Sequence, residues 1–546
     1  MVKKISRRLL LCVSIIGMAA SCSHPLEIYG EGDITSASGN RDCSLEEFQA
    51  SDPNCTGNFV VGAYSETYTA TPRPGWVFQG WRTYCEHNSL TTQCSFSQPA
   101  AMVRSYWFRP VPPLRAAFLE TCPNPPNCFE ILAPQLGAVT DTSIRIWQAI
   151  KGVATFEVRY RTGTDPFTSA SVVIDGTTGF VGTIELTGLS ANTTYDYETW
   201  LNGTQYETST FSTLPASGWT GQIRFGFATD YFHIFSPFLT LQQAAAKNFD
   251  FMLLIGDLIY EAQDPLIDNT VAAYTDRYWL TWNESNFTEL GKTTPLFMMW
   301  DDHEIVDDYY PGHIDPRDVA DRYPAARSAY DLYQDPHNPT SGGLLYYSFS
   351  APGGDFFVLD TRSHRDPNLD IDDANKSMLG DVQRNAMLDY LENSTAPFKF
   401  IITSVPFHLA ETGTDRWYSY QTERALILSE LEMRGISGVV FISGDSHWSG
   451  AFRMTSAGGY VYYDFVPSPG GTFIRKLPTM NNNPGETQIY ASDLYKTFGD
   501  FEIDLSGPTP MLRAAYVDED GVDRCVITIG SDETGVISPG PAATCL

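Results

Sequence analysis

Residues 295–310 read PLFMMWDDHEIVDDYY, an apolar run that passes directly into a cluster of acids. The cluster surrounds His303, and its acids are Asp301, Asp302, Glu304, Asp307 and Asp308. Like charges this close repel one another and raise each other's pKa. Such crowding is tolerable if several acids are solvated at the surface, or if a cation lies among them. The stretch therefore predicts a buried strand whose carboxyl end carries either an acidic surface or a metal site.

Four further apolar runs end in the same way: IRFGFATD (223–230), FDFMLLIGDLIYE (249–261), DFFVLDTRSHR (355–365) and GVVFISGDSHWSG (438–450). They deliver, in order, Asp230, Asp257 with Tyr260, Asp360 with Arg362, and Asp445 with His447. Helical segments such as ERALILSELEMRG alternate with these runs, which predicts an α/β layered domain over residues 219–546. Ligands of open α/β sheets bind beyond the carboxyl ends of the strands, so we expect these side chains to converge.

Each motif alone has a simpler explanation, because a Gly-Asp pair after a strand is often a turn and a single Asp often caps a helix. Taken alone, His303 or His447 is more typical of a hydrogen-bonded surface histidine than of a metal ligand. Five such strand ends together favour a metal site. Carboxylate, phenol and imidazole ligands suit hard or borderline ions such as Ca, Mg, Mn, Fe or Zn.

Two ions with one shared carboxylate would clamp both oxygens of an in-line phosphoryl displacement and generate hydroxide from bound water. Asp257, beside Gly256 at a tight turn, is the predicted bridging ligand. His303 is predicted to be the catalytic residue that stabilises the phosphoryl group or protonates the leaving oxygen. Arg362 is predicted to bind the substrate, because a guanidinium matches phosphate oxygens in a fork.

The first 21 residues have the pattern of an export signal, with Lys3, Lys4, Arg7 and Arg8 before an apolar stretch too short to span a membrane. The sequence AASC resembles a lipobox, which predicts lipidation of Cys22, with ordinary cleavage nearby as the alternative. SRRLLL resembles a twin-arginine signal. We therefore expect an exported protein in the periplasm, on the outer membrane as a lipoprotein, or at the cell surface.

Charge and cysteine usage agree with export. The net charge is −30, from 65 acids and 35 bases, which argues against a nucleic-acid-binding surface. Apart from Cys12 and Cys22, the cysteines form near-neighbour pairs without zinc-type CxxC spacing. The predicted disulfides, with the pairing of neighbours assumed, are Cys43–Cys55, Cys85–Cys94, Cys122–Cys128 and Cys525–Cys545.

The amino-terminal part is predicted to be rich in strands. Residues 22–118 contain TYTATPRPGWVFQGW (67–81), which resembles the internalin-type B repeat, a small β module that would act as a spacer or adhesion unit. Residues 119–130 form a predicted Pro-rich linker. Residues 131–215 show short strands at regular spacing, which predicts a β-sandwich. LTGLSANTTYDYE (186–198) resembles the tyrosine-corner stretch of fibronectin type III-like domains, with Tyr195 at the corner.

The motifs of residues 215–510 together resemble the PhoD-type alkaline phosphatases and phosphodiesterases of the calcineurin-like metallophosphoesterases. They include LLIGDLIYE, MMWDDHEIVDDYY, FFVLDTRSHR, SMLGDVQ, FIITSVPFH, FISGDSHWSG and DFVPSPG, in the family's order. The resemblance implies that Asp257 bridges two metals and that Tyr260 is a phenolate ligand of a ferric ion. It also implies that Asp302, Asp445 and His447 are ligands and that His303 is the catalytic histidine, with Asp307 a second-choice ligand.

One position departs from the family pattern. Where the family commonly has an iron-binding cysteine after the first strand, this chain has Asp230 in the stretch FATDYFH. A carboxylate in place of a thiolate keeps a ligand but hardens the site, which puts the family's iron–calcium pairing in doubt. His233 is a further candidate ligand. We expect two or more metal ions, Ca or Fe or both, with Zn, Mn and Mg as alternatives.

These observations predict a multidomain protein in which a small β module and a fibronectin type III-like sandwich precede a metallophosphoesterase domain. The expected function is hydrolysis of small-molecule phosphate esters by an exported monomer. One alternative is a phospholipase D-like phosphodiesterase. Another is a surface binding protein with an inert hydrolase domain.

Overall fold

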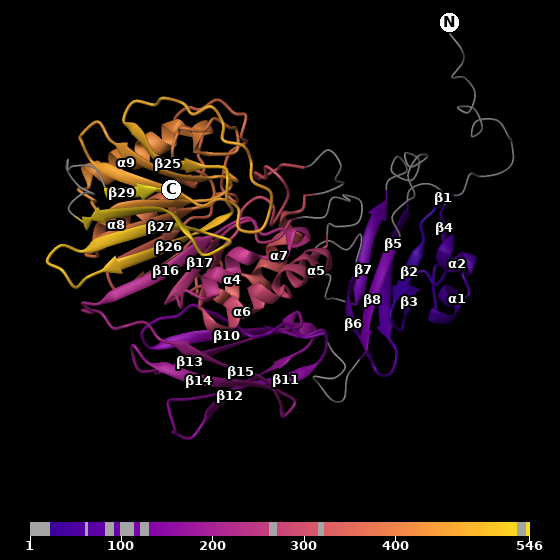
Figure 1. The fold of residues 1–546 in the computed structure, drawn as a ribbon. Helices are drawn as coiled ribbons and strands as arrows, with labels where there is room; N and C mark the ends of the chain where they lie inside the picture. Colours follow the sequence, from indigo (N-terminus) through magenta and orange to yellow (C-terminus); the bar gives the residue numbers. More distant parts are fainter. Residues whose placement is uncertain are drawn as a thin grey trace, which may run out of the picture. The chain divides into compact units, whose positions relative to one another are not determined.

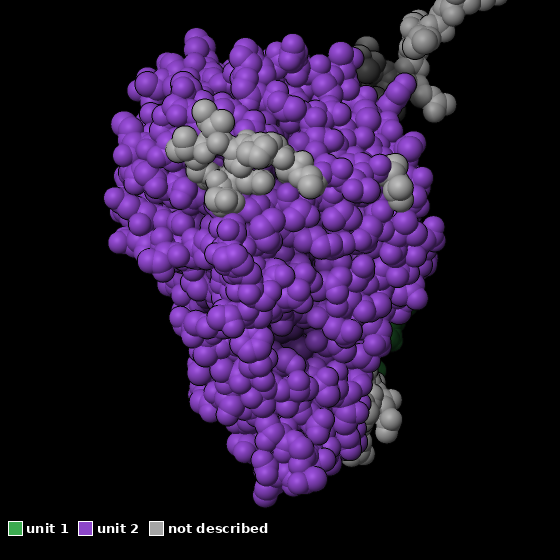
Figure 2. All heavy atoms as spheres, turned by 60° about the vertical axis from the view of Figure 1, so that its left-hand side comes forward, with its two compact units in different colours: residues 1–121, 266–272 green, residues 122–265, 273–546 purple. Residues whose placement is uncertain are grey.

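The computed structural model describes residues 22–60, 64–81, 92–98, 114–120, 130–260, 270–314, 321–531 and 542–545. The chain forms two compact units, residues 1–121 with 266–272 and residues 122–265 with 273–546 (Figure 2). The boundary between residues 121 and 122 falls inside the predicted linker. The predicted signal peptide and the CPNPPNC stretch lie outside the described residues. Within those residues, we find no helix with the length and apolarity that a membrane span requires.

The first unit is a small β structure. One sheet has the order β2 (Leu26–Tyr29), β8 (Leu114–Glu120), β6 (Trp76–Trp81), and another has the order β3 (Gly32–Ser36), β5 (Tyr64–Pro72), β7 (Gln93–Gln98). β1 (Cys22–Ser23) pairs with β4 (Phe59–Val60), and the described residues of this unit include the helices α1 (Leu45–Gln49) and α2 (Pro53–Thr56). The stretch 67–81 does turn between two strands, but its strands, β5 and β6, belong to different sheets.

Two of the four predicted disulfides are confirmed. Cys43 is bonded to Cys55, and Cys525 is bonded to Cys545. Cys94 is also disulfide-bonded, while Cys85, Cys122 and Cys128 lie outside the described residues.

The second unit begins with a β-sandwich. One of its sheets is antiparallel, in the order β12 (Thr168–Ile174), β11 (Ala154–Arg161), β14 (Thr194–Leu201), β15 (Thr204–Ser212). The facing strands are β9 (Gln135–Gly137), β10 (Ser143–Ala149) and β13 (Val181–Thr187). Buried and exposed residues alternate along β14, as expected of a strand with one face on a core. The Tyr195 hydroxyl accepts a hydrogen bond from the Ser190 amide at 2.8 Å, which is the contact predicted for a corner tyrosine.

The sandwich shares a sheet with the rest of the unit (Figure 1). The ten-stranded sheet has the order β13-β10-β9-β18-β17-β16-β26-β27-β28-β29, and β9 meets β18 in parallel through Gly137 and Leu296. The Trp147 indole donates to the Leu332 carbonyl at 2.9 Å across the same junction. The sandwich is therefore continuous with the part that carries the acidic strand ends.

The remaining strands of the ten-stranded sheet are β16 (Gln222–Ala228), β17 (Phe251–Ile255), β18 (Leu296–Met299), β26 (Thr497–Asp504), β27 (Met511–Asp518), β28 (Asp523–Gly530) and β29 (Ala542–Cys545). β16, β17 and β18 are parallel, whereas β26 to β29 pair antiparallel. The predicted alternation of strands and helices therefore ends before residue 497.

A seven-stranded sheet has the order β19 (Tyr347–Ala351), β20 (Gly354–Val358), β21 (Phe398–Thr403), β22 (Val439–Ser443), β24 (Val461–Val466), β23 (Ser449–Thr455), β25 (Glu486–Ser492). Helices α8 (Gly380–Asn393) and α9 (Gln421–Met433) bury Met387 and Ile427 against its outer face. The helices that accompany the ten-stranded sheet are α4 (Leu239–Ala245), α5 (Val271–Trp282), α6 (Ser285–Thr293) and α7 (Tyr323–Tyr333).

Aromatic side chains fill the space between the two sheets. Phe225 and Phe251 of the ten-stranded sheet lie edge-on to Phe356 of the seven-stranded sheet, with ring centroids 5.2 and 5.4 Å apart. Phe356 also stacks on Phe400 at 4.7 Å. Every residue of β17, β18, β21 and β22 is buried, as expected of parallel strands covered on both faces. This packing holds the carboxyl ends of the two sets of strands together.

Truncation of the central ring tests that packing. Phe356→Ala should lower the free energy of unfolding by about 3–5 kcal/mol, because the cavity would lie among rings that cannot collapse into it. Urea unfolding would measure the change, with Val382→Ala on the exposed face of α8 as the control. Equal stability of the two variants would contradict the inter-sheet role of Phe356.

Candidate metal centre

The predicted ligands follow the carboxyl ends of strands from both sheets. Asp230, Asp257 and Asp302 come from the loops after β16, β17 and β18, and Asp445 and His447 come from the loop after β22. These residues form three groups, and within each group the ligand atoms lie within 4.8 Å of one another. The groups are Asp230 with Asp257 and His447, Asp257 with Asp302 and His303, and Asp257 with Asp301 and Asp445. The expected convergence is confirmed. Asp257 belongs to all three groups, as a bridging ligand would.

An unusual backbone conformation turns these side chains inward. Asp230, Asp257, Asp445 and His447 all have positive φ angles, between 55° and 63°. Residues other than glycine seldom adopt this left-handed conformation, which costs of order 1–3 kcal/mol and concentrates at functional sites. Gly256 has φ 93°, and a Cβ atom there would lie 2.6 Å from the Cβ of Asp301. The loops after β17 and β18 thus approach too closely for any other residue at 256.

Glu304 joins those two loops. Its carboxylate accepts hydrogen bonds from the amides of Asp257 at 2.9 Å, Leu258 at 2.7 Å and Asp301 at 2.8 Å. The Gln334 side chain donates a fourth bond at 3.0 Å. Glu304 is therefore a positioning residue, and nothing in its sequence pattern distinguishes it from the neighbouring acids.

The carboxylates need a counter-charge. Burial, with Asp301 adding to it, raises the pKa of Asp230 to about 7. Burial followed by repulsion from Asp302 and Asp301 raises the pKa of Asp257 well above its ordinary value. Burial likewise raises the pKa of Asp445, although Arg416 opposes the shift through a 2.9 Å bond. A cation among these groups would remove the cost of ionising them.

Unpartnered oxygen atoms mark where a cation fits. Both carboxylate oxygens of Asp230, one each of Asp257 and Asp301, and the Tyr260 hydroxyl are buried without a hydrogen-bond partner in the described part of the chain. Buried polar atoms in folded proteins are normally bonded, so five such atoms in one place need an explanation. Oxygen donors of this kind suit hard cations. The residues present thus fit a centre of two ions.

His447 is oriented as a ligand. Its Nδ1 lies 2.9 Å from the Phe473 carbonyl oxygen, which can only accept, so Nδ1 carries the proton and Nε2 offers its lone pair. Nε2 lies 3.5 Å from Asp230. Burial, together with the charge of Arg475, lowers the pKa of His447 to about 3, which keeps the ring neutral. A neutral imidazole with its second nitrogen fixed by a carbonyl is the usual form of a metal-binding histidine.

The rings of Tyr260 and His303 lie in contact. Their centroids are 4.1 Å apart with the ring planes tilted by 32°, and Phe232 stacks on Tyr260 at 4.7 Å. Burial, followed by the charge of Asp257, raises the pKa of Tyr260 well above its ordinary value, so a phenolate ligand would need a strongly polarising ion. The backbone amide of His303 donates to Asp302 at 2.9 Å, which holds the histidine beside its neighbouring ligand.

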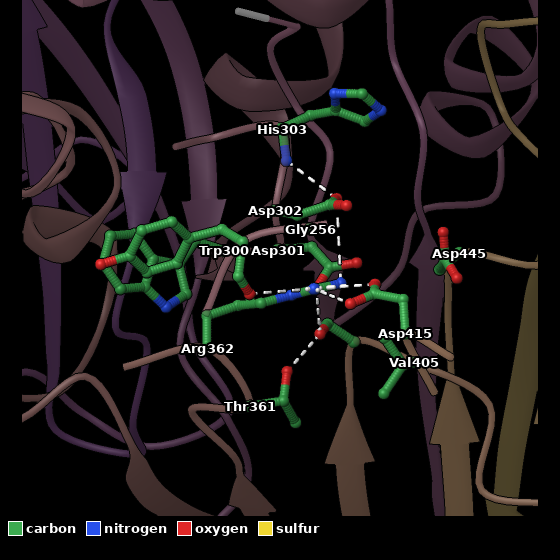
Figure 3. A network of polar contacts seen from close by, with 12 residues as sticks. Gly256, Trp300, Asp301, Asp302, His303, Thr361, Arg362, Val405, Asp415 and Asp445 are labelled. Carbon is green, nitrogen blue, oxygen red and sulfur yellow. Dashed lines mark hydrogen bonds and ion pairs between the residues drawn. The ribbon is translucent and has the colours of Figure 1, made fainter. Parts of the chain in front are cut away.

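Arg362 does not have the geometry predicted for it (Figure 3). Its side chain has no exposed surface, and it donates to Asp301 at 2.5 Å and to Asp415 at 2.8 Å. Burial tends to raise the pKa of Asp302, but Arg362 and His303 outweigh it and hold that pKa below its ordinary value. Arg362 is therefore positioned to neutralise the buried carboxylates around it. The structure does not support the predicted binding of substrate phosphate oxygens by this guanidinium.

The two second-choice ligands lie outside the groups. Among the described residues, neither Asp307 nor His233 belongs to a set of converging ligand atoms. The Asp307 side chain is 64% exposed and lies 3.8 Å from His303 Nε2. Instead, the neighbouring Asp308 forms a fourth group with Asp302 and Asp415.

The two facing sheets carry acids and histidines at their joined edge, and this arrangement defines a candidate metal centre. Comparison with known proteins gives the class more narrowly, because residues 227–475 match the family of PhoD-like phosphatases. Alkaline phosphatase D of Bacillus subtilis (strain 168) is 23% identical over 314 residues, which are 50% of this chain and 54% of that protein. The chain thus spans about half the length of this curated relative.

Solved structures share the fold. The structure of PhoD superposes with a TM-score of 0.63 at 18% identity, covering 74% of this chain and 90% of that one. The purple acid phosphatase PPD1 from yellow lupin (Lupinus luteus) seeds superposes with a TM-score of 0.57 at 13% identity, covering 86% and 93%. The chain therefore shares its fold with PhoD and with a purple acid phosphatase. The internalin-type and fibronectin type III-type assignments of the amino-terminal modules stay predictions.

The shared position of Asp257 can be tested by metal analysis. Asp257→Asn should remove at least one bound metal per chain, because the neutral amide offers one weaker donor where three groups converge. Inductively coupled plasma mass spectrometry of the purified protein would measure the loss. Asp307→Asn, a matched change at an exposed acid six residues beyond Asp301, should retain all the metal, and an unchanged metal content in Asp257→Asn would contradict the bridging position.

Proposed function

We propose that this protein is an exported, metal-dependent phosphatase or phosphodiesterase that hydrolyses small-molecule phosphate esters. The observation that carries the proposal is the position of Asp257, which lies within ligand distance of three separate groups of side chains. Such sharing is what a pair of ions a few ångströms apart requires. The match of residues 227–475 to PhoD-like phosphatases supports the same reaction.

One ion would be held by Asp230, Asp257, Tyr260 and His447, and the other by Asp257 with Asp302 and Asp445. When bound, such ions supply Lewis acidity for phosphoryl oxygens and acidify coordinated water. The oxygen and imidazole donors suit Ca, Mn, Mg, Zn or ferric iron. Asp230, in place of the family cysteine, favours a hard ion at the first position.

The chain's own residues contribute orientation and a proton. Glu304 holds the loop of Asp257 against the loop of Asp301 through amide hydrogen bonds. Arg362 and Asp415, both buried, keep Asp301 and Asp302 in place. The imidazole of His303 is partly exposed at the edge of the cluster, where its Nε2 can donate a proton to the leaving oxygen of the ester.

Export is supported by the disulfides and by the start of the chain. Cys43–Cys55 and Cys525–Cys545 are typical of proteins that fold in oxidising compartments. The charged and apolar pattern of residues 1–21 suits an export signal, and Cys22 suits a lipid anchor. We propose a monomer in the periplasm, on the outer membrane or at the cell surface.

Metal removal tests the reaction. The protein should hydrolyse p-nitrophenyl phosphate or bis-p-nitrophenyl phosphate, lose that activity on dialysis against a chelator, and regain it with a defined metal. Comparison of the two substrates would separate a monoesterase from a diesterase. A protein that binds two metals but hydrolyses neither substrate would favour the alternative of a surface binding protein with an inert hydrolase domain.

His303 can be tested apart from the metal. His303→Gln should lower kcat by about 10²- to 10⁴-fold, the usual contribution of a general acid, while the bound metal stays unchanged. A leaving group that needs no protonation, such as 2,4-dinitrophenol, should lose much less activity. If both leaving groups lost activity equally, His303 would not be the proton donor.

A further inference from the structure

A short segment after β24 links the two halves of the candidate metal centre. The rim segment, residues 470–475 (GGTFIR), lies along the loop that follows β16. The Gly471 amide donates to the Asp230 carbonyl at 2.9 Å, and the Phe232 amide donates to the Gly471 carbonyl at 3.2 Å. At its other end the Arg475 amide donates to the His447 carbonyl at 2.8 Å. The rim segment is thus bonded through its backbone to a predicted ligand on each sheet.

Close packing fixes the path of the rim segment. A Cβ atom at Gly471 would lie 2.6 Å from ring atoms of Phe238 and of Tyr231, so only glycine permits the approach. Phe473 places its carbonyl on His447 Nδ1 at 2.9 Å, and its ring centroid lies 4.7 Å from that of His447. The Phe473 ring is 48% exposed and so forms part of the outer wall of the centre.

The Arg475 side chain extends from this fixed backbone into solvent. Its Cζ lies 6.0 Å from the Phe473 ring centroid, the side chain is exposed, and it forms no ion pair with any acid in the described part of the chain. Arg362 and Arg416, by contrast, are buried and paired with carboxylates. Arg475 is therefore an exposed base without an ion pair among the described residues, next to an acidic cluster in a chain with 65 acids and 35 bases. Its guanidinium is available to an incoming anion.

The backbone of Arg475 starts beside the candidate metal centre. The Arg475 amide donates to the carbonyl of His447, whose Nε2 lies 3.5 Å from Asp230. His447 and Asp230 belong to the same group of ligand atoms, so Arg475 is bonded through its backbone to a residue that would hold an ion.

We propose that Arg475 binds the phosphoryl oxygens of the substrate, the role predicted from the sequence for Arg362. The inference rests on the proposed function and deepens it. A guanidinium offers parallel N–H donors that match two oxygens of a phosphate, and the exposed Phe473 ring below it limits the directions that the side chain can take. The local positive charge also counters the repulsion that an acidic protein exerts on an incoming anion.

Inorganic phosphate is the probe for the test. Isothermal titration calorimetry of the metal-loaded protein should show that Arg475→Ala weakens phosphate binding roughly tenfold or more, the usual effect of losing a charge-assisted hydrogen bond. Lys476→Ala removes the same charge from the next residue, which is also exposed, and should change the affinity by less than about twofold. Metal content, measured on the same samples, should be unchanged in both variants.

Equal phosphate affinities of Arg475→Ala and Lys476→Ala would overturn the proposal. If Arg475→Ala lost metal, the comparison would pass to Arg475→Lys, which keeps the charge but not the fork, and wild-type affinity in that variant would overturn the proposal equally. Because phosphate binding is measured without turnover, the proposed hydrolysis of esters and the proposed role of Arg475 can fail separately. Phosphate binding that depends on Arg475 in a protein that hydrolyses no ester would remove the proposed function alone, whereas ester hydrolysis with a KM insensitive to Arg475→Ala would remove this inference alone.

Discussion

Repulsion among buried carboxylates is the constraint on which the rest of the second unit depends. Asp230, Asp257, Asp301 and Asp445 lie together out of water. Among the described residues, Arg362 bonds to Asp301 and Arg416 bonds to Asp445. Such a cluster is unfavourable unless something positive lies within it. The cluster persists because the strands that carry it are held from behind by the aromatic layer between the sheets. The contacts among Phe225, Phe356 and Phe400 thus stabilise the fold and offset the repulsion between the carboxylates at the carboxyl edge.

The left-handed backbone conformation of the predicted ligands also brings their side chains together. A left-handed residue immediately after a strand reverses the direction of the side chain, so that acids from parallel strands face a common point instead of alternating between faces. Asp257 shows how the surroundings maintain that conformation, because Glu304 binds its amide and Gly256 lets the next loop pass close by. Contacts within the protein therefore support the geometry of the centre, which lowers the cost of ordering ligands around an ion.

Much of this centre could be predicted from the sequence, because a strand end followed by an acid leaves a local pattern. Asp257, Asp302, Asp445 and His447 were recognisable in that way. The roles of individual acids within 301–308 could not be predicted, since they depend on partners remote in the chain. The role of Glu304 depends on its hydrogen bonds to amides of another loop. The role of Arg362 depends on its bond to Asp415, 53 residues away. The layered sheets followed from alternating strands and helices, whereas the antiparallel strands β26 to β28 and the junction of β9 with β18 follow from tertiary pairing that no local periodicity reports.

That junction has a consequence for how the chain can be divided. The buried, apolar strand β18 is closed at this edge by β9, which pairs with Leu296, and by the Asn338 side chain, which bonds to the amide and the carbonyl of Met298. Without β9, the edge at Leu296 would be open. Open edges of this kind recruit strands from other molecules. The sandwich therefore covers part of an edge that belongs to the ten-stranded sheet, and a fragment that starts near residue 219 would expose it. The sandwich and the strands that follow it are thus best kept together when the chain is divided.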